Sequence, residues 1–250
     1  MPSLEAYSPS LDYSYAPGFF PATEALNHAP ERVRRVLIST KAVDTDAGRS
    51  LLRKAAALGV RAEEADRALA RISGKENCYA AAVFAKKEER AEAGKPQIVL
   101  AQASDCGNIG TILRTALGFG VCDVSLIRPC ADVFDPRTVR ASMGALFQLR
   151  VKTYPDYDAW RADNPGRMIY PFMLDASLPL PEVLRGKVPP DWVLAFGNEG
   201  SGLPAFWSQV GQAVRIPSND RVDSLNLSVA AAVGIYAFAG RTGLLGAPAT

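Results

Sequence analysis

A glycine-rich segment near the C-terminus carries the residues best suited to bind a ligand. The apolar run from Trp192 to Phe196 ends at Gly197, and Glu199 and Gly202 follow within five residues. Glycines let the backbone adopt unusual dihedral angles, and they leave amide donors exposed beside a single carboxylate. A strand that ends in such a loop is typical of a binding site in an α/β protein. A glycine-rich turn with a solvated Glu199 would produce the same pattern.

A second group of polar residues lies at the start of the last helix that the sequence predicts, Leu225 to Phe238. From Val229 onward this helix is apolar on every face and dense in Ala and Gly, which indicates burial against other backbone. Ser224, Asn226 and Ser228 crowd its start, and each of them could cap the helix. Three polar side chains exceed what one cap requires. We therefore expect this helix start and the preceding glycine loop to share a site.

A third polar segment joins a predicted strand to a predicted helix. Asn108 is well suited to cap this helix, and Arg114 lies six residues further on, about 9 Å along the axis and on a different face. The glycines between Asp105 and Ala116 do not have the spacing of the common phosphate-binding loops. A helix cap followed by a surface arginine explains the segment equally well.

Composition limits the classes of protein to which this chain can belong. Its 250 residues are 48% hydrophobic, which is enough for two modest domains without disulfides or a metal. The formal net charge of +2 does not indicate a nucleic-acid partner. The cluster of Arg32, Arg34 and Arg35 could bind a polyanion locally, although dispersed charge on a solvated face is the more common meaning of such a run.

The few histidine and cysteine residues argue against several kinds of catalytic site. His28 is the only histidine, so neither zinc nor a Ser-His or Cys-His nucleophile is expected. The four cysteines are irregularly spaced and no signal peptide precedes them, which favours a reduced cytoplasmic protein. No apolar stretch approaches the ~20 residues that a membrane helix needs.

The elements that must position these residues form two predicted α/β domains. Residues 1–18 read as a flexible arm, and residues 19–90 alternate helices and strands. A charged connection leads to residues 96–245, where apolar strands alternate with helices. That pattern predicts a mostly parallel sheet covered on both faces, with the site in the loops after the carboxyl ends of its strands.

Taken in order, these residues resemble the SpoU/TrmH-type RNA 2′-O-ribose methyltransferases of the SPOUT superfamily. The three family motifs match Asn108 to Arg114, Gly197 to Leu203 and Ile216 to Val229. Arg140 to Leu146 is similar to an intermediate small-residue segment of the family, and the likeness covers about Gln97 to Gly240. Three motifs in the correct order are far more specific than any one of them.

The resemblance implies a C-terminal trefoil-knotted fold, in which the last helix is threaded through an earlier loop. It also implies a homodimer, S-adenosyl-L-methionine as the cofactor and no metal. Backbone groups hold the cofactor in this family. By the match of motifs, these groups belong to Gly197, Ile216 and Leu225, with Gly202 shaping the loop.

The reaction that the resemblance implies is attack of a ribose 2′-hydroxyl on the sulfonium methyl group. Arg114 matches the catalytic arginine of the family, but a guanidinium with a pKa above ~12 is a poor base. We expect it to orient a phosphate and to stabilise the developing alkoxide. The remaining polar positions of the family match Asn108, Glu199, Ser224 and Asn226, which we expect to hold Arg114, the ribose and the cofactor loop in register. The alternatives are methylation of an RNA base on the same fold and a non-catalytic RNA-binding or assembly factor.

The predicted N-terminal domain resembles, more loosely, the L30e-like substrate domains of some family members. Phe19 to Leu26 and Gly74 to Phe84 carry this likeness, which implies that the domain binds rRNA or tRNA. The chain departs from the family at Asn77 to Ala80, where relatives often have His-Gln-Gly.

Overall fold

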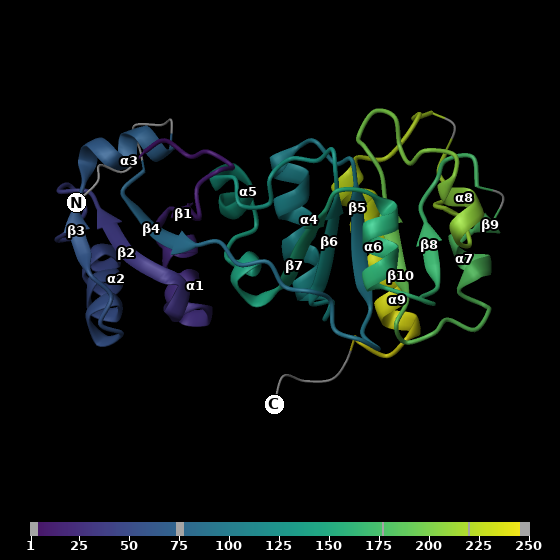
Figure 1. Ribbon diagram of the computed structural model, residues 1–250, viewed down its shortest axis with the longest axis horizontal. Coiled ribbons are helices and arrows are strands. Elements are labelled where there is room, and N and C mark those ends of the chain that lie inside the picture. Colours follow the sequence, from purple (N-terminus) through teal and green to yellow (C-terminus); the bar gives the residue numbers. More distant parts are fainter. Residues whose placement is uncertain (1–4, 74–77, 177, 220, 246–250) are drawn as a thin grey trace. The chain divides into compact units, whose positions relative to one another are not determined.

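The computed structural model describes residues 5–73, 78–176, 178–219 and 221–245 of the chain. These residues form two compact units (Figure 1). The N-terminal unit comprises Met1–Lys87 and Asp132–Gln148, and the C-terminal unit comprises Glu88–Ala131 and Leu149–Thr250. The division after Lys87 lies close to the predicted domain boundary. Residues 132–148, however, group with the N-terminal unit and not with the predicted second domain.

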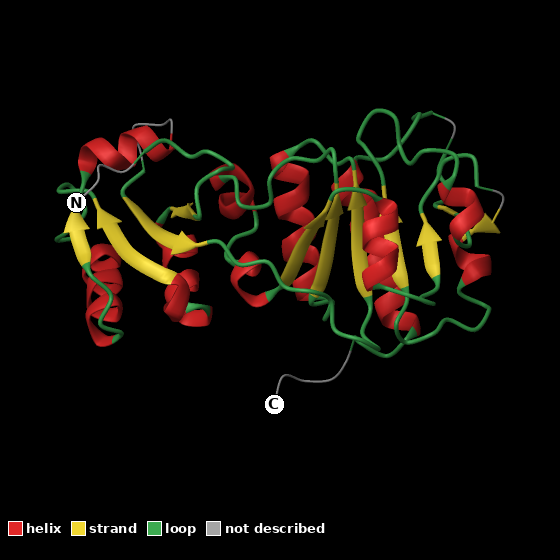
Figure 2. Ribbon diagram, in the orientation of Figure 1, coloured by secondary structure: helices red, strands yellow, loops and turns green. Residues whose placement is uncertain are grey.

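The N-terminal unit is built on a four-stranded sheet in the order β1-β4-β2-β3 (Figure 2). β4 is antiparallel to both β1 and β2, whereas β3 is parallel to β2. Tyr15, Leu37 and Val83 are buried in its core. The strands are β1 (Tyr13–Pro17), β2 (Val33–Ile38), β3 (Ala62–Glu64) and β4 (Ala80–Ala85). The helices are α1 (Phe19–His28), α2 (Asp46–Ala57), α3 (Asp66–Ser73) and α5 (Pro136–Ala141), with short 3-10 helices at Pro30–Arg32 and Ala145–Gln148.

The prediction of a flexible arm is wrong for the described part of residues 1–18. β1 forms an edge strand in which Pro17, opposite Ala81, ends the pairing. An edge strand tolerates proline because one side of its backbone has no ladder partner. Residues 1–4 of the predicted arm, and residues 74–77 of the segment compared with the L30e-like domains, lie outside the described residues.

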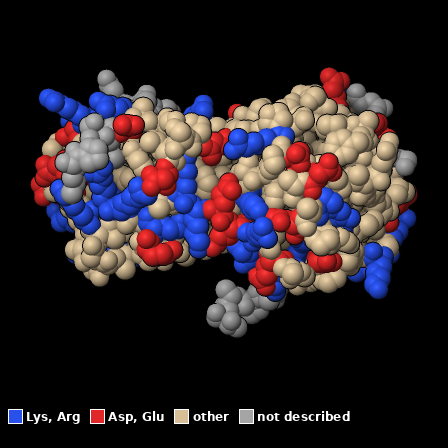
Figure 3. Space-filling model, in the orientation of Figure 1, with Lys and Arg blue, Asp and Glu red and all other residues tan. Residues whose placement is uncertain are grey.

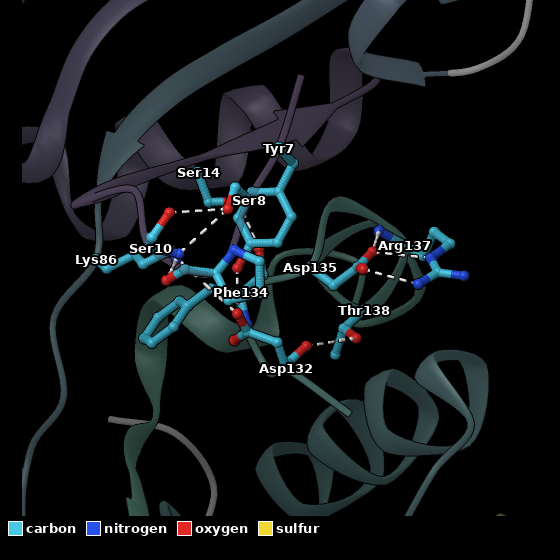
Figure 4. Close-up of polar contacts among 11 residues, drawn as sticks. Tyr7, Ser8, Ser10, Ser14, Lys86, Asp132, Phe134, Asp135, Arg137 and Thr138 are labelled. Carbon is cyan, nitrogen blue, oxygen red and sulfur yellow. Dashed lines mark hydrogen bonds and ion pairs between the residues drawn. The ribbon is translucent and has the colours of Figure 1, made fainter. Parts of the chain in front are cut away.

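The residues before β1 are held by polar contacts within the same unit (Figure 4). The Tyr7 hydroxyl donates to the Asp132 carboxylate, and the Ser14 hydroxyl donates to the Phe134 carbonyl at 2.5 Å. The Lys86 ammonium lies 4.6 Å from the centroid of the Tyr7 ring and 3.9 Å from an Asp132 carboxylate oxygen. Burial lowers the pKa of Lys86 against the opposing effect of Asp132. Tyr7 and Ser14 are therefore fixed to residues 132–134.

The C-terminal unit contains a five-stranded sheet in the order β7-β6-β5-β10-β8, in which every neighbouring pair is parallel. This confirms the predicted parallel sheet. The adjacent strands β5 and β10 are buried along their whole length, as expected of strands covered on both faces. The strands are β5 (Gln97–Ala101), β6 (Asp123–Ile127), β7 (Arg150–Tyr154), β8 (Ile169–Pro171) and β10 (Val193–Phe196).

Helices cover both faces of this sheet (Figure 1). α4 (Cys106–Gly118) and α9 (Leu227–Arg241) pack against each other, and Phe238 of α9 lies against Trp192 and Tyr170 with ring centroids 5.4 and 4.7 Å apart. On the other face, α6 (Tyr157–Asp163) and α8 (Trp207–Val210) contribute Trp160 and Trp207 to a second apolar cluster.

Three short elements of the C-terminal unit do not follow from the sequence pattern. These are β9 (Leu178–Pro179), α7 (Leu180–Val183) and α8. β9 pairs with β11 (Val214–Arg215) in a separate two-stranded sheet, so β11 is not part of the main sheet. The threading of α9 through an earlier loop stays a prediction. Among the described residues, no helix is both long and apolar enough to cross a membrane.

Candidate active site

The loops after β5 and β10 meet at the carboxyl end of the parallel sheet. α4 begins at Cys106, and the Asp105 side chain caps it by accepting from the Asn108 amide at 2.7 Å. The prediction that Asn108 caps this helix is therefore wrong. Before the cap, Gln102 has a φ of 61°, which is uncommon for a residue with a side chain. The Gln102 carbonyl accepts from the Asn198 side-chain amide at 2.9 Å, which ties the two loops together.

The glycine loop after β10 closes so tightly that only glycine fits at Gly197. A Cβ atom there would lie 2.2 Å from the Gly202 carbonyl carbon and 2.3 Å from the Leu203 nitrogen. Asn198 and Gly202 exchange backbone hydrogen bonds of 3.1 and 2.9 Å, and Gly202 has a φ of 69°. These contacts give the chemical reason for both predicted glycines, because a side chain at either position would clash or strain the turn.

Glu199 projects from this loop onto the start of α4. Its carboxylate accepts from the Ser104 amide at 3.1 Å, the Ser104 hydroxyl at 2.8 Å and the Asp105 amide at 3.1 Å. A fourth donor is the Asn108 side-chain amide at 3.2 Å. Burial alone would raise the pKa of Glu199, but the hydrogen bonds from Ser104 and Asp105 outweigh it and lower this pKa to about 2. Glu199 is thus ionised at neutral pH, and its carboxylate joins the glycine loop to the start of α4.

Asn108 and Asn226 extend this network to the start of α9. The Asn226 side-chain amide donates to the Asn108 side-chain oxygen at 3.1 Å. The Asn226 oxygen accepts from the amides of Ser228 at 2.8 Å and Val229 at 3.4 Å, so Asn226 is the N-cap of α9. The helix begins two residues later than predicted. One chain of hydrogen bonds therefore connects α9, α4 and the glycine loop.

A cavity of 370 Å³ lies beside this network at the carboxyl end of the sheet. All four predicted cofactor-binding residues line it, and so do two of the predicted catalytic residues, Glu199 and Ser224. The four are Gly197, Gly202, Ile216 and Leu225. Its volume is within the usual range for small-molecule sites.

Two stacked aromatic rings and one glycine shape the wall of the cavity under α9. Phe172 and Phe196 both line the cavity, and their ring centroids lie 4.6 Å apart with an angle of 28° between the planes. A Cβ atom on Gly234 would lie 2.7 Å from the Phe172 ring and 3.2 Å from the Phe196 ring. The absence of a side chain at Gly234 therefore allows α9 to approach these rings.

Arg114, Asn108 and Asn226 are not among the residues that line the cavity. Arg114 lies on the exposed side of α4, and none of the described lining residues belongs to that helix. The structure thus brings Asn108, Glu199 and Asn226 together and leaves Arg114 apart from the cavity of its own chain.

Sequence reasoning missed the part of the cavity wall that follows β8. β8 ends at Pro171, so Phe172 to Asp175 form a loop that lines the cavity. The rule that sites form at the carboxyl ends of parallel strands could have identified this loop.

The segment from Arg140 to Leu146 packs within the N-terminal unit. Met143 and Gly144 both have positive φ angles, of 49° and 85°. A Cβ atom on Gly144 would lie 2.4 Å from the Glu24 Cβ atom of α1. Close packing thus accounts for its small residues.

The arginine cluster of the N-terminal unit is occupied by contacts within that unit. Arg34 pairs with Asp12 at 2.6 Å, and Arg35 pairs with Glu63 at 2.9 Å. The Arg32 side chain donates to the Ala85 carbonyl at 3.1 Å. On the face shown in Figure 3, basic and acidic side chains are interspersed. Among the described residues, no group of His, Cys, Asp and Glu could hold a metal ion.

The C-terminal unit matches one known protein family. A sequence model of the SpoU rRNA methylase family matches residues 95–236. A 23S rRNA guanosine 2′-O-methyltransferase of Bacillus subtilis is 31% identical over 160 residues, covering 62% of this chain and 62% of the relative. Ribosomal RNA small subunit methyltransferase G 2 of Syntrophobacter fumaroxidans is 32% identical over 140 residues, covering 56% of this chain and 26% of the relative. The matches thus span less than two thirds of these relatives' own lengths.

Solved structures match nearly the whole chain. The AdoMet-bound rRNA methyltransferase from Sinorhizobium meliloti has a TM-score of 0.75 and 25% identity, covering 94% of this chain and 89% of that chain. The SpoU methyltransferase AviRb from Streptomyces viridochromogenes, in complex with AdoMet, has a TM-score of 0.77 and 24% identity, covering 94% and 92%. The chain therefore has the fold of the SpoU methyltransferases.

Proposed function

Because the chain belongs to the SpoU rRNA methylase family, we propose that it is an RNA methyltransferase that transfers a methyl group from S-adenosyl-L-methionine to a ribose 2′-hydroxyl of rRNA or tRNA. One observation carries this proposal. The four residues that the family motifs assign to the cofactor, which are distant in sequence, all line one cavity at the carboxyl end of the parallel sheet.

The cavity fits this cofactor in shape and in chemistry. Gly197 keeps the loop narrow where any Cβ atom would collide with backbone, so backbone groups of the loop can approach a ligand closely. Ile216, Leu225 and Leu227 offer apolar surface for an aromatic base. When bound, S-adenosylmethionine supplies an electrophilic methyl group.

The residues of the chain would then orient the acceptor and stabilise charge. A guanidinium such as that of Arg114 can bind an RNA phosphate and stabilise a developing alkoxide, but it is a poor base. Glu199, Asn108 and Asn226 hold the start of α4 against the glycine loop. These three are positioning residues in our proposal.

We further propose that the protein acts as a homodimer. Val229, Val233 and Tyr236 of α9 are 48%, 38% and 58% exposed and recur at helical spacing on one face. The Tyr236 ring packs against Phe119, which follows α4, with centroids 5.4 Å apart. An exposed apolar stripe of this kind favours an interface. A dimer on this face would place its interface beside α4, the helix that carries Arg114.

We also propose a cytoplasmic location. All four cysteines are free thiols, as expected of a protein in a reducing compartment.

Transfer of a labelled methyl group tests the proposed activity. Purified protein, labelled S-adenosylmethionine and RNA from cells that lack the gene should give labelled RNA. A variant with Gly197→Val should abolish labelling, because its Cβ atom would collide with the backbone of Gly202 and Leu203 and distort the loop that lines the cavity. An RNA-binding or assembly factor without turnover would give no label with either protein.

A further inference from the structure

The loop after β8 forms a wall of the cavity to which no family motif assigns a role. It is firmly held at its start. The Phe172 amide donates to the Ala195 carbonyl at 2.9 Å, and the Met173 amide donates to the Val214 carbonyl at 2.9 Å. Asp175 lines the cavity two residues further on. The backbone that leads to Asp175 is thus held to β10 and β11 at its start, and the Asp175 side chain lines the cavity at an exposed position.

Among the described residues that line the cavity, the charged side chains are both negative. Among its described lining residues, Asp175 and Glu199 are the only ionisable side chains, and none is Lys, Arg or His. Both Glu199 oxygens already accept hydrogen bonds from Ser104, Asp105 and Asn108. Within the described part of the chain, the Asp175 carboxylate makes no hydrogen bond or ion pair. Asp175 is therefore the lining carboxylate that a ligand can use.

The buried lining of the cavity is apolar, whereas its exposed lining combines polar side chains with the apolar Leu174 and Leu225. Phe196, Leu203 and Val214 are buried at 2%, 7% and 0% exposure, whereas Asp175, Ser218 and Ser224 are exposed. This arrangement favours a ligand with an apolar aromatic end inside and a charged end at the rim. The charge at the rim is negative, so it complements a cation.

We propose that Asp175 binds the α-ammonium group of S-adenosylmethionine and thereby recognises the amino-acid half of the methyl donor. This inference rests on the proposed function, because it assigns a contact within the same cofactor site. A carboxylate and an ammonium group form a charge-assisted hydrogen bond, which is stronger than a neutral one. The contact lies at an exposed rim, so it should weaken as salt concentration rises.

Binding measurements with three ligands test the role of Asp175 directly. Asp175→Asn keeps the size of the side chain and removes its charge. By isothermal titration, it should weaken S-adenosylmethionine and S-adenosylhomocysteine by about tenfold, a typical effect of losing one charged hydrogen bond. Both ligands carry the ammonium group. 5′-Methylthioadenosine lacks the amino-acid half, so its affinity should change less than twofold.

The matched control is Asp158→Asn, which removes an exposed carboxylate of α6 that does not line the cavity. It should leave all three affinities unchanged. Equal affinities of the Asp175→Asn variant and the wild type for S-adenosylmethionine would overturn the inference, and so would an equal loss for 5′-methylthioadenosine. Failure of the wild type to bind S-adenosylmethionine at all would instead overturn the proposed function.

Discussion

Glu199 has the most defined role of any single side chain in the site. Its position in a glycine loop suggested a ligand contact. Four of its donors come from Ser104, Asp105 and Asn108, more than 90 positions earlier, and a fifth is the adjacent Asn198 side-chain amide at 3.4 Å. No local pattern reveals partners at that separation. The sequence could therefore predict that Glu199 belongs to the site, but not that its carboxylate is already saturated.

Replacing Glu199 with Gln should destabilise the protein by about 2 kcal/mol, since charged hydrogen bonds are lost and an amide donor faces backbone amides. Because the folded-state pKa of Glu199 is about 2, below the usual value, its contribution is present above about pH 4.5 and is lost as pH falls toward 2. As the pH falls through this range, the free energy of unfolding of the variant should therefore decrease less than that of the wild type. Urea unfolding at several pH values measures this. Glu182→Gln, at an exposed carboxylate of α7, is the control.

Arg114 is the residue whose proposed role depends most on chemistry rather than on structure. Arg114→Lys should lower methyl transfer by about a hundredfold or more, because a point charge does not replace a planar fork of donors. Cofactor affinity should stay within twofold, since Arg114 does not line the cavity. Rates and binding of this variant should be compared with Arg185→Lys, at an exposed position of the same unit. Near-wild-type transfer would exclude an essential role for Arg114.

At the scale of elements, apolar runs predicted the buried strands better than the boundaries of helices. The predicted cap of α4 was wrong by three residues because Asp105 and Asn108 both suit a cap, and only the fold shows that the Asp105 carboxylate reaches the Asn108 amide. β1 was missed because Tyr13 to Pro17 is too short and too close to Gly18 to stand out, and its pairing with β4 is a long-range contact.

Alanine substitutions at two helical glycines distinguish the effect of close packing from the effect of helix propensity. Gly234→Ala should destabilise the protein by about 1–3 kcal/mol and weaken cofactor binding, because its methyl group would displace the Phe172 and Phe196 rings. Gly118→Ala, at the end of α4, meets nothing within 4 Å and should stabilise by about 0.5 kcal/mol. Thermal unfolding and cofactor titration measure both. An equal gain in stability from the two changes would contradict the packing described for α9.

At the scale of the whole molecule, the sequence predicted two α/β domains but not how the chain is divided between them. Residues 132–148 lie between two strands of the C-terminal sheet, β6 and β7, yet they group with the N-terminal unit. Local composition does not mark this segment as different, because its helix and small residues suit either unit. Long-range contacts such as that of Ser14 with Phe134 decide its place.

If the homodimer forms through the exposed apolar face of α9 that Val229, Val233 and Tyr236 share, a charge on this face should separate the subunits. Tyr236→Glu should raise the dimer dissociation constant by about thirtyfold or more, as expected for a central aromatic contact. Leu58→Glu, at a side chain 45% exposed in the N-terminal unit, should not. Sedimentation velocity over a range of concentrations measures both. A wild-type protein that stays monomeric at micromolar concentration would rule out this dimer.

The most direct test of the account identifies the atom that receives the methyl group. RNA labelled by the protein from S-adenosylmethionine is hydrolysed with alkali, which cleaves each linkage through attack by the adjacent 2′-oxygen. A methylated 2′-oxygen cannot attack, so we expect the label in alkali-resistant dinucleotides, and it should be strongly reduced with Arg114→Lys. Label in mononucleotides that carry a methylated base, or no label in RNA at all, would contradict ribose methylation.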